Sequence, residues 1–153
     1  MSTIRGFLNN TRKAIVNLDS DVESAIKLIE QDLLDLNLED QLFQGLDNRG
    51  RIIGVYSKAT EEMTQGLTGR GYPKLAGSPY NFFDRGDLFR GTRYRFANGD
   101  RLEIFSTDSK VSELEARFGK GRLFGLTEPN EKKFNYELLL PLLRGFIKRH
   151  YRA

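Results

Sequence analysis

Apolar residues recur at spacings of three and four between positions 20 and 38, which is the period of one face of an α-helix. The recurring positions are Val22, Ile26, Ile29, Leu33 and Leu36. Ser20 is followed three residues later by Glu23, the pattern of a capping box, and this pair predicts where the helix begins. We therefore expect one amphipathic helix over residues 20–38.

The stretches on either side of this helix carry weaker patterns. Residues 4–18 show a fainter helical period, so residues 1–19 are expected to form an arm or a helix before a single domain of residues 20–150. Apolar runs at 42–46 and 51–56 flank the turn-forming letters Asp-Asn-Arg-Gly, which favours a hairpin.

A second hairpin is indicated by two alternating runs on either side of a turn. In the first, Thr92, Tyr94 and Phe96 alternate with arginines, and in the second, Leu102 and Ile104 alternate with Glu103 and Phe105. A two-residue turn at 98–99 would pair a polar position with an apolar one. A three-residue loop over 98–100 pairs Phe96 with Leu102 and keeps each face uniform, so we expect that register.

The C-terminal part reads as two helices. A short helix over 111–118 is expected to end at Gly119. Thr127 can cap the last helix, and Pro129 suits its first turn. Apolar residues recur every four positions along this helix, at Phe134, Leu138, Leu142 and Phe146. Pro141 interrupts that pattern and predicts a kink near Glu137 and Leu138.

Residues 64–83, called the long loop below, separate the two expected hairpins and follow a short helical turn expected at 59–63. Four glycines and two prolines between positions 64 and 81 exclude a long helix or a central strand. Loops of this length are uncommon in compact domains and usually serve a function or become ordered by a partner. The element order predicts an α+β fold, in which a long N-terminal helix and a C-terminal helix pack on a small antiparallel sheet of hairpins.

Composition narrows the possible chemistry. The chain has no cysteine and one histidine, His150, which excludes disulfides, thiolate chemistry and a metal site built from several imidazoles of one chain. No apolar run is long enough to span a bilayer, and the N-terminus lacks the continuous apolar stretch of a secretory signal. We therefore expect a protein without cofactor, membrane partner or catalytic activity, which acts by binding other macromolecules.

Charge is distributed unevenly along the chain. Residues 1–40 carry eight acidic residues against Arg5, Arg12, Lys13 and Lys27, whereas the stretch from Lys132 to Arg152 carries six basic residues against Glu137. This polarity suits head-to-tail contact between identical copies or contact with an acidic partner, and two solvated helix faces would give the same pattern.

Several short motifs have two interpretations. Glycines at 66, 69 and 71 could form a phosphate loop, but Tyr-Pro follows them where a helix should start, which favours an ordinary flexible loop. Arg85-Gly86-Asp87 matches a cell-adhesion tripeptide, yet a tight turn with Gly86 at positive φ explains it. Asp84 and Asp87 could be the acid pair of a hydrolase, although surface or capping roles are commoner.

Basic and aromatic residues alternate in the long loop and in the second hairpin. In the long loop they include Arg70, Tyr72, Lys74 and Tyr80, and in the hairpin Arg93, Tyr94, Arg95 and Phe96. Such a pattern would suit a basic module that binds single-stranded nucleic acid. The alternation in the hairpin equally fits arginines facing water above a buried aromatic face, so both interpretations stay open.

The middle of the chain resembles the small neck, head–tail connector and tail-completion proteins of tailed bacteriophages, also called virion-morphogenesis proteins. These proteins carry a Thr-Gly-x-Leu-x-x-Ser turn, a strand hairpin and a helix ending in Phe-Gly. Here residues 85–91 occupy the turn, with Gly86 and Leu88 matching while Arg85 replaces Thr and Gly91 replaces Ser. The hairpin and Phe118-Gly119 follow in the same order. The letters Leu-Phe-Gln-Gly-Leu-Asp at 42–47 and Gly-Leu-Thr at 125–127 are also similar to proteins of Bacteroidetes phages.

This resemblance, over residues 40–147, implies a structural protein of the virion that waits in the host cytoplasm before assembly. Identical subunits would form a ring at the neck or the tail terminus, in contact with portal, adaptor or tail-tube proteins and with genomic DNA in the channel. The expected contact residues are Arg70, Tyr72, Lys74 and Tyr80 of the long loop, with the hairpin tip at 97–101. Gly86, Asp87 and Leu88 form the turn motif, and Lys148, Arg149 and Arg152 are candidates for contact with DNA or a neighbouring subunit.

Overall fold

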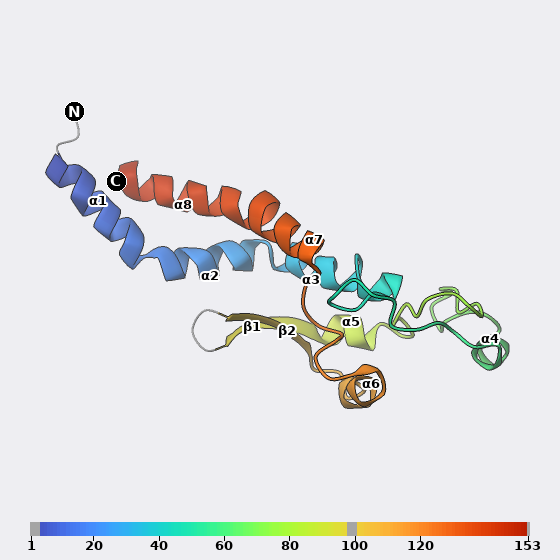
Figure 1. The fold of residues 1–153 in the computed structure, drawn as a ribbon. Helices are drawn as coiled ribbons and strands as arrows, with labels where there is room; N and C mark the ends of the chain where they lie inside the picture. The colour runs from blue at the N-terminus through green and yellow to red at the C-terminus, as the bar shows by residue number, and fades with distance from the viewer. Residues whose placement is uncertain (1–3, 98–100, 153) are drawn as a thin grey trace. The chain divides into compact units, whose positions relative to one another are not determined.

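The computed structural model describes residues 4–97 and 101–152, in which helices are combined with one antiparallel hairpin (Figure 1). The mixed content confirms the expected α+β class. In chain order the elements are α1 (Ile4–Val16), α2 (Leu18–Leu28), α3 (Glu30–Leu38), the 3₁₀-helix η1 (Leu42–Gln44), α4 (Lys58–Thr64), α5 (Asp87–Gly91), β1 (Thr92–Ala97), β2 (Arg101–Ser106), α6 (Val111–Phe118), α7 (Glu128–Lys132), the π-helix η2 (Lys133–Leu139) and α8 (Leu140–Arg152).

The chain forms two compact units. The helical unit comprises Met1–Leu33 together with Lys132–Ala153, and the mixed unit comprises Leu34–Glu131. Buried apolar side chains of the helical unit are Ala14, Ala25, Ile26, Ile29, Leu33 and Phe134. Those of the mixed unit are Leu34, Leu36, Leu38, Leu42, Tyr56, Leu88, Ile104 and Leu123.

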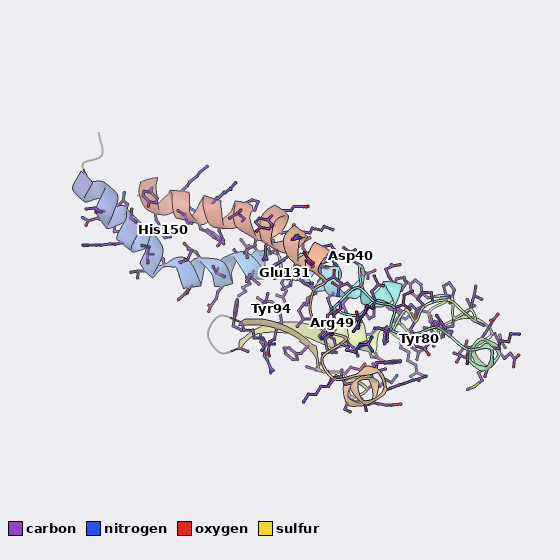
Figure 2. The ribbon with its side chains drawn as sticks, in the orientation of Figure 1. Asp40, Arg49, Tyr80, Tyr94, Glu131 and His150 are labelled. Carbon is purple, nitrogen blue, oxygen red and sulfur yellow. The ribbon has the colours of Figure 1, made fainter. Side chains whose placement is uncertain are left out.

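In the helical unit, α8 packs against α1 and α2 (Figure 1). Two polar contacts join the C-terminal end of α8 to α1 and to the first turn of α2. The hydroxyl groups of Thr11 and Tyr151 lie 2.9 Å apart, and Nε2 of His150 lies 2.8 Å from Oδ2 of Asp21 (Figure 2). Between α1 and α2 the helix is interrupted at Asn17, which lies at φ −93° and ψ 0°.

The predicted helix over residues 20–38 differs from the structure at its start. Helix α2 begins at Leu18, and the hydroxyl of Ser20 donates to the carbonyl of Asn17. Ser20 therefore lies inside the first turn, and the predicted capping box is wrong. Asp19 and Asp21 lie in that first turn, where negative charge is favourable beside the positive end of the helix dipole.

The same predicted helix is also divided at Ile29, which lies at φ −116° and ψ 25°. Its N–H donates to the carbonyl of Ile26, and helical bonding resumes when the N–H of Leu33 donates to the carbonyl of Ile29. The apolar period continues across this interruption, since all three of these residues are buried.

The C-terminal helix differs from the expected kinked α-helix. Helix α7 begins at Glu128, directly after Thr127, with Pro129 in its first turn as predicted. The next seven residues, 133–139, form a π-helix, and Pro141 lies in the first turn of α8. A proline ring would clash with the carbonyl four residues earlier in an α-helix, and a wider turn relieves that clash.

In the mixed unit, β1 and β2 pair in the predicted register. Phe96 lies opposite Leu102, Tyr94 opposite Ile104, and Ala97 opposite Arg101, so three residues connect the strands. The loop itself, 98–100, and therefore most of the predicted contact tip, lies outside the described residues. The short helices α4 and α6 also occur as expected, and α6 ends at Gly119, where φ is +107°.

The first predicted hairpin, over 42–46 and 51–56, is reduced to a backbone turn and one bridge. Residues 42–44 form the 3₁₀-helix η1, and Leu46 and Ile52 make an isolated antiparallel bridge. The backbone turns at 47–50, where the N–H of Gly50 donates to the carbonyl of Asp47, and the carboxylate of Asp47 also accepts the N–H groups of Arg49 and Arg51. The later part of this segment pairs with the long loop, where Val55 bridges Pro79.

Candidate functional site

The long loop is organised by its own side chains. The buried Thr68 accepts hydrogen bonds from the N–H groups of Arg70 and Tyr72 through its hydroxyl, at 3.2 and 3.0 Å. The buried amide of Asn81 accepts a hydrogen bond from the hydroxyl of Tyr56 at 2.9 Å. These bonds give irregular backbone the partners that a helix or sheet would otherwise supply.

Aromatic side chains attach the long loop to the rest of the mixed unit. The ring of Tyr72 lies edge-on to Phe43 of η1, with centroids 5.0 Å apart, and to Phe83 at 4.8 Å. Tyr80, labelled in Figure 2, contacts Phe118 of α6 at 5.5 Å. The two contacts of Tyr72 are edge-to-face and that of Tyr80 is tilted; aromatic pairs of this kind are favourable beyond the area they bury, so they help to fix the position of the loop.

The four contact residues predicted in the long loop have different surroundings. Arg70 is exposed, and the Tyr72 side chain retains 40% of its accessible area. Lys74 is largely covered and pairs with Asp84 at 3.5 Å, and Tyr80 is half-buried. Arg70 and part of Tyr72 are therefore accessible to solvent, whereas Lys74 and Tyr80 are more covered by the loop and its neighbours.

Apolar side chains around the long loop are unusually exposed. We call this set the loop face; its members are Val55, Met63, Leu67, Tyr72 and Leu75, with exposed fractions of 47, 85, 49, 40 and 50%. The sequence interpretation concentrated on basic and aromatic residues and missed the aliphatic members. Their only signal is that Leu67 and Leu75 interrupt a stretch rich in glycine and proline.

The backbone brings Leu67 and Leu75 to one part of the loop. Leu67 forms an antiparallel bridge with Pro73, and the N–H of Lys74 donates to the carbonyl of Gly66 at 2.6 Å. The side chain of Leu75 lies close enough to Gly66 that an added Cβ there would be 3.3 Å away. The two leucines are thus held near each other by paired backbone.

The turn motif is structural in the mixed unit. Gly86 has φ +82°, as predicted, and a Cβ there would come within 3.0 Å of the Phe83 ring. Asp87 pairs with Arg90 one turn later in α5. Leu88 is buried, and its carbonyl accepts hydroxyl hydrogen bonds from the first residue of β1 and the last residue of β2.

A cavity of about 180 Å³ adjoins this turn. Apolar rings and side chains form much of its wall, and the acidic residues Asp84, Asp87 and Asp108 also line it. One oxygen of Asp108 is buried without a hydrogen-bond partner among the described residues. Two of the three carboxylates are engaged elsewhere, Asp84 with Lys74 and Asp87 with Arg90.

The electrostatics of Asp84 bear on the hydrolase interpretation. Burial raises its pKa, but the charge of Lys74 and the backbone N–H of Gly69 outweigh this and leave the pKa below its ordinary value. A general acid needs a raised pKa to hold its proton near neutral pH. Asp84 is therefore suited to an ion pair and not to proton donation.

The most tightly held charge in the mixed unit is Asp47, whose side chain is fully buried. Oδ1 accepts the N–H groups of Arg49 and Arg51, both at 2.9 Å. Oδ2 receives the guanidinium groups of Arg51 and Arg122, the latter at 2.8 and 3.1 Å. Burial raises the pKa of this carboxyl, but these hydrogen bonds outweigh it and lower the pKa to about 2.

Amide side chains next to Asp47 bind the segment 121–130. Asn37 donates to the carbonyls of Leu123 and Gly125, at 3.2 and 2.9 Å. Gln41 also donates to Gly125 and accepts the N–H of Thr127 at 2.8 Å. We call Asn37, Gln41 and Asn130 the amide clasp, since Asn130 donates to both Leu36 and Gln41. Local sequence patterns could not reveal it, because its members join segments far apart in the chain.

The basic residues predicted on the last helix belong to the helical unit. Lys148 and Arg149 are exposed, and the guanidinium carbon of Arg149 lies 4.3 Å from the centroid of the Phe146 ring. This stacking keeps the Arg149 charge at the surface while covering an apolar ring. The side chain of Arg152 lies outside the described residues.

Comparison with protein-family profiles, curated proteins and solved structures finds no match to the chain. Among the described residues, no helix is long and apolar enough to cross a membrane. In the same part of the chain, no group of three or more histidine, cysteine or acidic residues has a geometry that could hold a metal ion.

Proposed function

We propose that this chain is a structural subunit of a tailed-bacteriophage virion, which forms a homo-oligomeric ring at the neck or tail terminus and helps to join head and tail. The observation that carries the proposal is the loop face, a set of exposed apolar side chains in and beside a loop that is already ordered by hydrogen bonds and aromatic contacts. Contiguous exposed apolar area favours a protein partner, and Leu67 and Leu75 are held near each other on this loop.

The composition of the loop face fits a protein–protein contact. Tyr72 and Arg70 are of the residue types that most often dominate binding energy at interfaces. Val55, Leu67 and Leu75 would supply apolar area around them. Because the loop is held by Thr68, Asn81 and its aromatic contacts, little conformational entropy would be lost on binding. Portal, adaptor or tail-tube proteins are the partners that the resemblance implies.

The rival function, a basic nucleic-acid-binding module, receives less support from the described side chains. Arg95 pairs with Glu103 at 3.0 Å and lies 5.0 Å from the centroid of the Phe105 ring. Tyr94 and Phe96 contact each other and are half-buried. Free aromatic faces, which nucleic-acid bases would stack on, are therefore few in the hairpin.

The proposal is tested by particle composition and by assembly of variants. The wild-type chain should be present in purified phage particles and should have a solution mass of several subunits. Replacing Leu67 and Leu75 together with serine should leave the fold intact but produce heads without attached tails, counted by electron microscopy. Glu62→Gln on α4 is the matched control, because Glu62 is exposed and lies outside the loop face.

Two results would overturn this assignment. The first is a wild-type chain that stays monomeric at every concentration and is absent from particles. The second is high affinity for single-stranded nucleic acid that weakens steeply with salt, because a contact made through phosphates releases bound counterions.

A further inference from the structure

Helix α8 of the helical unit has two different sides. Leu142, Leu143, Phe146, Ile147 and His150 are half-buried and lie on the side that faces α1 and α2. The opposite side carries Arg144, Gly145 and Lys148, all exposed. We call these three residues the basic side of α8. Arg144 and Lys148 are four residues apart, so their charges lie one above the other on the helix.

Gly145 in the middle of this basic side is unfavourable for an isolated helix, because glycine loses more backbone freedom than any other residue. Packing among the described residues does not explain it, since a Cβ added there would meet nothing within 4 Å. A glycine at an exposed helix position allows the backbone of another helix to approach closely. Close approach of a helix from another molecule would therefore explain why glycine occupies position 145.

Helix α2 presents the opposite charge. Asp19 and Glu23 are exposed and four residues apart, and they form what we call the acidic stripe. Among the described residues, no ion pair is seen for Asp19, Glu23, Arg144 or Lys148, whereas Asp21 between the two acidic residues pairs with His150. The two stripes therefore have equal spacing, opposite charge and no ion-pair partner among the described residues.

Apolar side chains are also exposed where α1 meets α2, directly before the acidic stripe. Ile15, Val16 and Leu18 retain 68, 81 and 40% of their accessible area. We call these three residues the junction patch. Because α8 packs against only one side of α1 and α2, the junction patch stays exposed to solvent in the monomer.

We propose that a second copy of this chain covers these features, with the basic side of α8 in one copy lying on the acidic stripe of the other. The junction patch would be buried beside the charged contact, and Gly145 would mark the point of closest approach between helices. Charge complementarity indicates that the partner is a second copy, because one chain carries both the basic side of α8 and the acidic stripe of α2. The inference rests on the proposed assembly function and specifies which surfaces mediate it.

The test is a pair of charge-reversal variants of the full chain, studied by sedimentation velocity. One variant carries Asp19→Lys with Glu23→Lys, and the other carries Arg144→Glu with Lys148→Glu. Each should weaken self-association by roughly a hundredfold, because like charges would then meet across the contact. Mixing the two variants should restore association, since every contact in a mixed assembly again joins opposite charges.

A matched control distinguishes the effect of a changed net charge from the effect of changing the proposed contact. Lys58→Glu with Lys120→Glu changes the net charge by the same amount as the α8 variant, on exposed residues of the mixed unit. It should associate as the wild type does, and far-ultraviolet circular dichroism should show that all three variants keep their helix content.

The outcomes separate this inference from the proposed function. Loss of association in each variant, with recovery in the mixture, supports the contact. If the wild type associates and both variants do so equally well, the contact is wrong while assembly stands. If the mixture fails to recover, the complementarity is refuted. A monomeric wild type refutes the assembly function itself, and with it this contact.

Discussion

Replacing Asp47 with asparagine should destabilise the mixed unit by an amount that the structure allows us to estimate. The carboxylate is fully buried and receives two backbone N–H groups and two guanidinium groups. Its pKa falls from 3.8 to about 2, and one pKa unit corresponds to about 1.4 kcal/mol, so the charged form contributes about 2.5 kcal/mol. Asparagine keeps an acceptor for the backbone N–H groups but leaves both arginines without a carboxylate.

The lowered pKa of Asp47 also determines how the stability difference between wild type and variant changes with pH. A carboxyl group with a lowered pKa contributes stability that is fully present above its unfolded-state pKa, near 3.8, and is lost as the pH falls towards 2. The difference in unfolding free energy between wild type and Asp47→Asn should therefore be about 2–3 kcal/mol at pH 7 and shrink steadily between pH 4 and pH 2.

Urea denaturation followed by tyrosine fluorescence at several pH values measures this difference. Glu62→Gln is the control, because an exposed carboxylate on α4 should give a difference near zero at each pH. A difference below about 1 kcal/mol at pH 7, or one that does not shrink in acid, would refute the reasoning, because the buried charge would then not be the source of the stability.

Three further changes test other features. Gly86→Ala should destabilise the chain by about 1 kcal/mol or more, measured by thermal unfolding, because φ is +82° and the added Cβ would meet the Phe83 ring. Gly145→Ala should raise the stability of a non-associating variant by about 1 kcal/mol, since the added methyl group meets nothing; an unchanged melting temperature would contradict this. Asn37→Ala should cost about 1–3 kcal/mol through loss of its bonds to the Leu123 and Gly125 carbonyls, and faster amide hydrogen exchange in residues 121–127 should accompany it.

Local patterns in the sequence predicted the elements whose geometry depends on neighbouring residues. The hairpin register followed from alternation, because shifting a strand by one residue would turn its apolar face outwards. The end of helix α6 could be predicted at Gly119, because glycine readily adopts the positive φ that commonly follows the last residue of a helix. No sequence pattern marks the break at Ile29 in the helix predicted over residues 20–38, because the spacing of apolar residues continues through it.

The misread segments are those in which side chains compete with regular backbone pairing. At 42–56 the sequence has the pattern of a hairpin, yet the buried Asp47 takes the N–H groups of Arg49 and Arg51. Its second partner, Arg122, is 75 residues away, and no window of the sequence contains both. The exposed leucines of the loop face were likewise hidden, because exposure depends on how the long loop folds back on itself.

The amide clasp has a consequence for the way the chain is built. Asn130 donates to the carbonyl of Leu36 at 2.8 Å, across 94 residues, so the mixed unit starts and finishes at neighbouring points. A module whose ends meet can be inserted into, or removed from, a host sequence without stretching the flanking chain. Residues 34–131 can thus be regarded as a cassette carried within a pair of terminal segments. A circular permutant of residues 34–131 tests this. In it Glu131 is joined to Leu34, the chain begins at Ser78 and ends at Gly77, and the protein should still fold.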